Sequence, residues 1–561
     1  MSWDEAVAEV CGPGGRYELV DGVVDGRPYK LFKNTPPSLR YLFELSSGYG
    51  DLDYLVYEDE RITFAEAWAK VGAMGHLLVE RYGVAHGDRV AIAMRNYPEW
   101  IIAFQAITSV GAVAVALNAW WTTDELEYGF EDCGAKVALV DQERAERLAP
   151  IRESLGLSVI GVRLERDLEG VDRLEDVFDP GAALPEVAID LDDDATILYT
   201  SGTTGHPKGA VSTHRAVLSG LLAFGARSTV SALMEPPKEE ADGDGPKDRT
   251  SYILVVPLFH ATGLIPVMLG TTASGAKLVM MYRWDPERAL ELIERERVTA
   301  FVGVPTMSWD LLESPDFEKR DTSSLVSVGG GGAPAPAELV RRVDKGFAKG
   351  RPQIGYGMTE TNAYGPGNSG ADYLRKPTSS GRAVPVMEVR VVDEDGNPVP
   401  TGEIGEICFR GPNLIRGYWN KPEATAEVID ADGWLRSGDL GRLDDEGFIF
   451  VEDRAKDMVL RAGENIYCAE VEGAVYEYPG VAEAAVFGVP HERLGEEVAL
   501  AVVPSPGSEI DVEGLVAHLK RHLAAFKVPT IVEVRDERLP RNASGKILKR
   551  ELRDASDPAS A

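Results

Sequence analysis

Residues 89–118 read RVAIAMRNYPEWIIAFQAITSVGAVAVALN, and this stretch decides the fold class. The apolar run at 89–94 predicts a strand, the segment at 98–110 predicts a buried helix, and 111–118 predicts a second buried strand. The uncharged residues 101–121 are long enough to cross a bilayer, but polar residues interrupt them. A helix–strand pair covered on both faces has the same hydropathy. We therefore expect a buried strand–helix–strand unit and no stable membrane insertion.

Short apolar runs alternate with amphipathic segments over residues 88–354. The run at 277–281, for example, precedes an amphipathic segment at 286–297, which precedes another apolar run at 299–305. Repeated strand–helix alternation is typical of an α/β fold with largely parallel sheets. Residues 388–411 break this pattern, because Gly- and Asn-rich turns join their apolar runs. They predict a small antiparallel β unit.

A second, compact α/β segment follows this unit. Its strands and its helix are expected at 484–490, 498–504, 531–536 and 512–526. The predicted fold class is therefore α/β. It has a large N-terminal domain of stacked, mostly parallel sheets with helices plus the small β unit, and a small C-terminal α/β domain. We expect these domains to span residues 1–452 and 458–561, with a hinge at residues 453–457.

The composition is typical of a globular protein, with 44% hydrophobic and 27% charged residues. The chain has 58 Lys and Arg residues and 91 Asp and Glu residues. The resulting net charge of −33 opposes binding to nucleic acid or to an anionic membrane. Four widely spaced cysteines predict neither a disulfide framework nor a zinc site. The acidic N-terminal stretch has no signal region, so we expect a cytoplasmic protein. The oligomeric state, a homodimer included, stays open.

The strongest chemical signal is the segment TSGTTGHPKG at residues 200–209, directly after an apolar run. Its hydroxyls, its glycines and Lys208 suit a polyphosphate, because backbone N–H groups can approach the anion closely. It is not a Walker A loop, since no Gly-Lys-Ser/Thr follows at the required spacing. By composition alone, a surface turn between a strand and a helix is the alternative.

Five further segments follow in order, and each one alone would be an ordinary turn, loop or charged run. They are GGGGAP at 329–334, GYGMTE at 355–360, WLRSGDLG at 434–441, DRAKD at 453–457 and PRNASGKI at 540–547. Together with residues 200–209 they resemble the motif series of the adenylate-forming superfamily. That superfamily includes acyl-CoA synthetases, peptide-synthetase adenylation domains and firefly luciferase. The resemblance covers nearly the whole chain.

The resemblance implies that the chain binds ATP and Mg²⁺. An aromatic face suits adenine and a hard carboxylate oxygen suits Mg²⁺, so Tyr356 is expected to stack on the base and Glu360, with Thr203, to hold the metal ion. Asp439 and Arg454 are expected to contact the ribose. The ATP- and AMP-binding residues implied in this way are Thr200, Ser201, Gly202, Thr203, Thr204, Gly205, Lys208, Gly331, Gly332, Ala333, Gly355, Tyr356, Gly357, Met358, Thr359, Asp439 and Arg454.

Adenylation also needs a cation at the reacting phosphate. A carboxylate attacks the α-phosphorus while pyrophosphate leaves, so negative charge accumulates at one point. By resemblance, Lys546 reaches this point. The small domain is expected to be mobile and to rotate about Lys456, exchanging the adenylation site for a coenzyme A path lined by Gly463. The catalytic residues implied are Lys546, Thr203, Glu360 and His260.

The segment RAGENIYC at residues 461–468 departs from the pattern SGGENIYP that is frequent in the superfamily. Arg461 and Ala462 add bulk, and Cys468 stands where proline is frequent. These differences lie on the surface that the resemblance assigns to the thiol step.

Residues 257–263, PLFHATG, distinguish between members of the superfamily. Amino-acid adenylation domains carry Phe-Asp where this chain has Phe259-His260, so no anion is available there to pair a buried ammonium group. An amino-acid substrate is therefore disfavoured. The resemblance implies an acid–CoA ligase whose acyl pocket is lined by His260 and Gly331.

The expected reaction has two steps. A fatty or other hydrophobic acid reacts with ATP to give acyl-AMP and pyrophosphate, and acyl-AMP then reacts with coenzyme A to give acyl-CoA and AMP. The substrate class also includes cyclic, steroid side-chain and aryl acids as alternatives. Two other functions stay open: transfer of the acyl group to a carrier protein or an amine, and nucleotide binding without catalysis.

Overall fold

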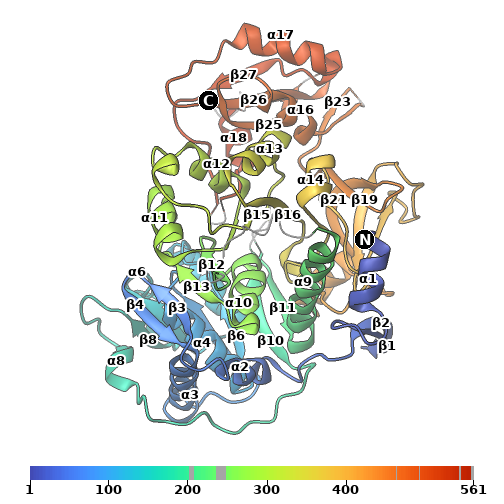
Figure 1. Cartoon of the computed structure of the whole chain (residues 1–561). Helices are drawn as coiled ribbons and strands as arrows, with labels where there is room; N and C mark the ends of the chain where they lie inside the picture. Colours follow the sequence, from blue (N-terminus) through green and yellow to red (C-terminus); the bar gives the residue numbers. More distant parts are fainter. Residues whose placement is uncertain (201–206, 236–247, 463, 492, 543–544, 557–561) are drawn as a thin grey trace.

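The computed structural model describes residues 1–200, 207–235, 248–462, 464–491, 493–542 and 545–556 (Figure 1). In Figure 1 the C-terminal segment, in red, sits at one end of a larger body that contains the rest of the chain. The described residues of that body form two eight-stranded sheets, a four-stranded sheet and a two-stranded hairpin, and the C-terminal segment adds a five-stranded sheet. The α/β fold class is thereby confirmed.

The first eight-stranded sheet contains the segment that predicted the fold class. Strand β5 (Arg89–Ala93) pairs in parallel with β6 (Val113–Ala116), and helix α4 (Pro98–Ser109) connects them. Every α4 residue except Glu99 is buried, so protein covers the uncharged surface as expected. The sheet order is β20-β11-β10-β6-β5-β7-β8-β9, with β7 (Val137–Asp141), β8 (Ser158–Val162), β9 (Val171–Arg173), β10 (Asp194–Tyr199), β11 (Gly209–Thr213) and β20 (Gly417–Tyr418).

The second eight-stranded sheet has a parallel centre and an antiparallel pair at each edge. Its order is β17-β16-β15-β14-β12-β13-β3-β4. The strands are β3 (Asp53–Tyr57), β4 (Glu60–Thr63), β12 (Ser251–Leu254), β13 (Lys277–Met280), β14 (Ala300–Gly303), β15 (Ser327–Gly331), β16 (Arg351–Gly355) and β17 (Gly367–Ser369). The carboxyl ends of β14, β15 and β16 lie side by side, because their registers end at Gly303, Gly331 and Gly355.

One hydrophobic core includes buried residues of both large sheets and of the helices between them. Burial of apolar surface on this scale is the main force that holds the two sheets together. The helices of the large body are α1 (Trp3–Cys11), α2 (Leu39–Ser47), α3 (Phe64–Glu80), α5 (Thr123–Cys133), α6 (Gln142–Leu148), α7 (Arg152–Leu155), α8 (Leu174–Val177), α9 (His214–Met234), η1 (Gly263–Leu269), α10 (Gly270–Ser274), α11 (Pro286–Glu296), α12 (Pro305–Glu313), η2 (Phe317–Lys319), α13 (Ala337–Gly346), η3 (Thr359–Thr361), α14 (Gly370–Arg375) and α15 (Pro422–Val428).

Helix α9 is the one described helix whose length and composition would allow it to cross a membrane. It packs against α1 and η1, and core helices of globular proteins pass the same test of length and composition. Its composition is therefore weak support for a membrane span.

The small β unit is antiparallel, as predicted. Its strands are β18 (Glu388–Val392), β19 (Gly405–Arg410), β21 (Leu435–Leu443) and β22 (Ile449–Arg454). After β18 the chain reverses where the Asp393 carboxylate accepts the Asn397 backbone N–H at 2.8 Å. The separate hairpin pairs β1 (Leu19–Val24) with β2 (Arg27–Phe32).

The C-terminal segment has its own hydrophobic core. Its elements are β23 (Val459–Arg461), β24 (Glu464–Ile466), α16 (Cys468–Tyr476), β25 (Val481–His491), β26 (Gly495–Pro504), α17 (Val512–His522), η4 (Ala525–Lys527), β27 (Ile531–Val534) and α18 (Lys549–Ser556). The helix predicted at 512–526 ends earlier, at His522. The chain has to turn there, because β27 pairs in parallel with β26.

Candidate active site

Tyr356, Asp439 and Arg454 meet although three different segments supply them. Tyr356 directly follows β16, and its hydroxyl donates to Asp439 Oδ2 at 2.6 Å. Asp439 on β21 lies opposite Arg454 on β22, and Arg454 Nε is 3.6 Å from Asp439 Oδ1. Burial, followed by the Asp439 charge, holds the pKa of Tyr356 well above its ordinary value, so the phenol stays a donor. A hydrogen bond and an ion pair to Asp439 therefore join the adenine and ribose candidates in one group.

Glu360 lies in η3 with only 8% of its surface exposed. Its Oε1 accepts the Tyr418 hydroxyl at 2.7 Å, and Lys208 Nζ is 4.9 Å from the centre of the Tyr418 ring. Burial raises the pKa of Glu360, while the Tyr418 hydrogen bond and the charges of Arg454 and Lys208 act in the opposite direction. A hard, buried carboxylate beside these cations suits a Mg²⁺ ion with an attached polyphosphate.

Lys546 comes from the C-terminal segment and reaches the same group. Burial, and then repulsion by Arg454, lowers the pKa of Lys546 to about 8. Its backbone N–H donates to Asn542 Oδ1 at 2.9 Å, which closes the loop that holds it. Gly545 packs against the large body, because a Cβ at this position would lie 3.0 Å from Val304 Cγ2. A second contact between the two parts joins Arg538 to Asp310 at 2.7 Å.

The glycine tract of β15 provides the wall next to these groups. Gly331 pairs in register with Gly355, and a Cβ on Gly331 would lie 2.4 Å from the Gly355 carbonyl oxygen. A Cβ on Gly330 would lie 1.7 Å from the carbonyl oxygen of Gly303. Neighbouring backbone therefore occupies the space of a side chain, and glycine is needed for the strands to approach this closely. Gly332 follows, and its Cβ would lie 3.7 Å from Val304 Cγ1.

His260 precedes η1, which begins at Gly263. Burial lowers the pKa of His260 to about 4, so the imidazole is neutral at pH 7. Its Nε2 has no hydrogen-bond partner among the described residues. A neutral polar atom without a hydrogen-bond partner suits the wall of a pocket that binds a ligand.

Arg227 is a candidate site residue that the sequence did not indicate. It lies on α9, and a Cβ on Gly355 would be 3.7 Å from its Nη2 atom. Its Nη1 donates to the Gly365 carbonyl oxygen at 3.1 Å, and the rings of Phe224 and Tyr364 lie 5.3 and 5.7 Å from the guanidinium carbon. Burial lowers its pKa. Within the described part of the chain, no carboxylate forms an ion pair with it.

The structure describes most of the remaining predicted residues. Thr200 and Lys208 form the base of the predicted phosphate loop, since the Thr200 N–H donates to the Lys208 carbonyl at 2.9 Å. Ser201, Gly202, Thr203, Thr204, Gly205 and Gly463 lie outside the described residues. Gly357, Met358 and Ala333 lie in the loops that follow β16 and β15, and Thr359 is the first residue of η3; all four are partly exposed.

The turn after β22 contains Lys456, which is exposed. Near the end of β22, just before this turn, buried Asp453 accepts the backbone N–H of Cys468, the first residue of α16. A proline at position 468 has no N–H and could not donate this bond. Arg461, another departure from the superfamily pattern, pairs with Glu497 at 2.6 Å. Arg461 and Cys468 therefore both have structural partners.

Comparison with known proteins agrees with this arrangement. Residues 43–419 match the AMP-binding enzyme family, and residues 470–546 match the AMP-binding enzyme C-terminal domain. The chain is 40% identical over 496 residues to a feruloyl-CoA synthase of an Amycolatopsis species, covering 88% of this chain and 93% of that protein. It is 34% identical over 499 residues to the long-chain-fatty-acid–CoA ligase FadD13 of Mycobacterium tuberculosis, with the same two coverages.

Among solved structures, ATP-bound MatB from Rhodopseudomonas palustris matches with a TM-score of 0.80 at 32% identity, covering 93% of this chain and 100% of that one. Fold, motif order and sequence similarity thus agree. The chain belongs to the family of AMP-binding enzymes and is an AMP-forming acid–CoA ligase of the adenylate-forming superfamily.

Proposed function

We propose that this ligase activates carboxylic acids that have a hydrogen-bond acceptor or an anion far from the reacting carboxylate, with aryl acids as the main candidates. The similar proteins leave the acid open, because one is named for a feruloyl group and another for long-chain fatty acids. The observation that supports the proposal is the unpaired guanidinium of Arg227 beside Gly355.

Arg227 borders the region assigned to the acid. Gly355 is the register partner of Gly331, which the superfamily places in the acyl pocket, and Arg227 lies against Gly355. A guanidinium has five N–H donors, and Arg227 gives one of them to Gly365. A plain hydrocarbon tail at this point would leave a buried cation without an anion, which is unfavourable. An acceptor on the acid would gain a charge-assisted hydrogen bond worth about 1.5–3 kcal/mol.

The first step uses the group around Lys546. A carboxylate oxygen forms a bond to the α-phosphorus of ATP, the bond to the β-phosphate oxygen breaks, and pyrophosphate leaves with the charge. In our proposal Lys546 and Arg454 stabilise the added negative charge, and Tyr356 with Asp439 holds the nucleoside. Glu360, with Thr203, would hold the Mg²⁺ ion, which supplies positive charge to the leaving phosphates.

The second step needs a different arrangement of the same chain. The thiolate of coenzyme A attacks the acyl carbon of the adenylate, and AMP leaves. We propose that residues 458–561 rotate as a domain against residues 1–452, with Lys456 as the pivot of the 453–457 hinge. This movement would withdraw Lys546 and bring Gly463 to the coenzyme A path. Four free, buried cysteines are compatible with a reducing cytoplasm, which we propose as the location.

The test uses two pairs of acids, in which the second acid of each pair has an additional polar group, and compares the wild type with one variant and one control variant. Pyrophosphate release and kcat/KM are measured for cinnamic and 4-hydroxycinnamic acid, and for octanoic and octanedioic acid, with ATP, Mg²⁺ and coenzyme A. We expect the wild type to prefer the second acid of at least one pair by about tenfold or more, which corresponds to about 1.4 kcal/mol. In Arg227→Met this preference disappears. The control is Arg215→Met on the same helix, because Arg215 pairs with Asp192 at 2.5 Å on the surface.

Three outcomes separate the claims. If none of the acids, nor a wider panel of carboxylic acids, gives acid-dependent AMP and pyrophosphate, then the proposed assignment of the site is wrong. If acids are activated but Arg227→Met leaves the ratios unchanged, only the role of Arg227 is wrong. If the wild type prefers octanoic acid and Arg227→Met weakens that preference no more than Arg215→Met does, the substrate is a plain fatty acid.

A further inference from the structure

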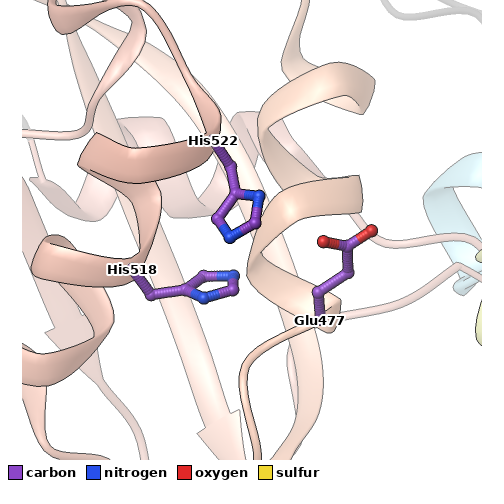
Figure 2. A group of neighbouring side chains, drawn as sticks. All are labelled: Glu477, His518 and His522. Atoms are coloured by element: carbon purple, nitrogen blue, oxygen red, sulfur yellow. The ribbon is translucent and has the colours of Figure 1, made fainter.

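Three potential metal ligands gather on the small domain, away from the adenylation site. Glu477 follows the last residue of α16, while His518 and His522 lie one turn apart on α17. Figure 2 shows the three side chains as neighbours, and one ligand atom from each lies within 4.8 Å of the others. The centres of the imidazole rings are 4.4 Å apart. Helix α17 lies on the side of the small domain that faces away from the large body (Figure 1).

A hydrogen bond to the backbone fixes the tautomer of His518. Its Nε2 lies 3.0 Å from the carbonyl oxygen of Ala474 on α16. A carbonyl oxygen can only accept a hydrogen bond, so Nε2 has to carry the hydrogen. In the neutral ring, this leaves the lone pair on Nδ1. Histidines that bind metals commonly donate their other N–H to a carbonyl or carboxylate in this way, which fixes the tautomer and the ring.

Two helix C-termini at this point favour a cation, and they oppose the nearby positive charges of Lys520 and Arg521 in the last turn of α17. Both α16 and α17 end at this point, so the partial negative charges of two helix C-termini add to the carboxylate of Glu477. The i, i+4 spacing of His518 and His522 places both rings on one face of α17. Glu477 is exposed at a helix end, so its carboxylate can turn inward at little cost.

We propose that Glu477, His518 and His522 bind a divalent transition-metal ion of the zinc type. Two imidazole nitrogens and one carboxylate oxygen suit Zn²⁺, whereas Mg²⁺ prefers an all-oxygen set. The ligand set contains no cysteine, and all four cysteines are buried and free. A bound ion would join α16 to α17 and leave at least one coordination position to water. The site therefore stabilises the small domain and is separate from the Mg²⁺ that accompanies ATP.

The experiment titrates the full, untagged chain with Zn²⁺ by calorimetry in a buffer that contains excess Mg²⁺. We expect one equivalent to bind, and Zn²⁺ to raise the melting temperature. His522→Gln and Glu477→Gln change exposed side chains, so they should melt like the wild type without Zn²⁺ but bind it at least about tenfold more weakly. The control is His491→Asn. His491 is another exposed histidine of the small domain, and its Nδ1 accepts two backbone N–H groups that an asparagine oxygen can also accept.

Co²⁺ provides a second readout, because its visible absorption reports nitrogen and oxygen ligation directly. The wild type and His491→Asn should give the same spectrum, and His522→Gln should lose it. The proposal is overturned if Zn²⁺ does not bind with saturation in the presence of Mg²⁺. It is also overturned if His522→Gln and His491→Asn bind Zn²⁺ with the affinity of the wild type, or if all variants lose binding equally.

Discussion

Replacing Lys546 by glutamine should stabilise the free enzyme while it abolishes the first half-reaction. Burial lowers the pKa of Lys546 from its ordinary 10.5 to about 8. The unfolded chain therefore binds this proton more tightly than the folded protein, and the charge opposes folding below pH 8. A difference of about 2.5 pKa units corresponds to on the order of 3 kcal/mol at pH 7. Glutamine keeps most of the length of the side chain and removes this cost.

The pH dependence gives the sign of the effect. Stability of the wild type should rise as the pH increases from about 8 to 10.5, because the folded protein loses the proton before the unfolded chain does. The advantage of Lys546→Gln should be full at pH 7 and small near pH 10.5. Without the charge of Lys546 at the α-phosphorus, acid-dependent ATP–pyrophosphate exchange should fall by a hundredfold or more, or about 3 kcal/mol.

Lys549 offers a matched control three residues away. It is also buried, but it pairs with Glu472 at 2.7 Å, and the charges of Glu472 and Asp453 hold its pKa above the ordinary value. Lys549→Gln should therefore destabilise the protein, since it leaves a carboxylate without its partner. Thermal unfolding of the three proteins without ligand, at pH 7 and pH 10, measures both effects. If Lys546→Gln melts no higher than the wild type at pH 7, Lys546 is not buried in the free enzyme. If the variant keeps full exchange activity, Lys546 does not act at the α-phosphorus.

Three further variants test other contacts. Tyr418→Phe removes the hydroxyl that donates a hydrogen bond to Glu360. The free energy of unfolding in urea should fall by about 1–3 kcal/mol at pH 7, and by less at pH 4, where the carboxyl is protonated. Equal losses at the two pH values would contradict this. Cys468→Pro removes the N–H that donates to Asp453 and should destabilise the protein by about 1–3 kcal/mol. Cys468→Ser keeps this donor and should destabilise the protein less. Equal melting temperatures of the two variants would refute the role of the hydrogen bond. Lys456→Pro should keep pyrophosphate exchange but block thioester formation from synthetic acyl-adenylate, because a rigid hinge prevents rotation. Loss of both half-reactions in a folded variant would count against the domain rotation.

The sequence predicts those features whose cause is local. Residues 98–109 form a buried helix between two parallel strands, because apolar residues surround the helix and short apolar runs precede and follow it. The order of strands in the two large sheets has no such local signal, since it depends on which edges pair over long sequence separations.

The site residues also divide into those with a local signal in the sequence and those without one. Tyr356, Asp439, Arg454 and Lys546 could be selected from their motifs, and the structure brings them together. Tyr418 could not be found, because its contact with Glu360 depends on the pairing of β20 with β11.

Two more features needed the fold for the same reason. Arg227 was missed because α9 is apolar on most faces, so the pattern does not show which residues point inward. Cys468 looked like a departure from a pattern until the structure showed that its N–H has a buried acceptor.

The close approach of β14, β15 and β16 limits how this enzyme can be redesigned or can diverge. Gly330 and Gly331 have backbone oxygens where a Cβ would stand, so even alanine at either position requires a strand to move. A library that varies these glycines would return mostly misfolded proteins. Under our proposal, changes in acid preference come instead from side chains such as Arg227 on α9 and His260 before η1, which can be exchanged without moving these strands.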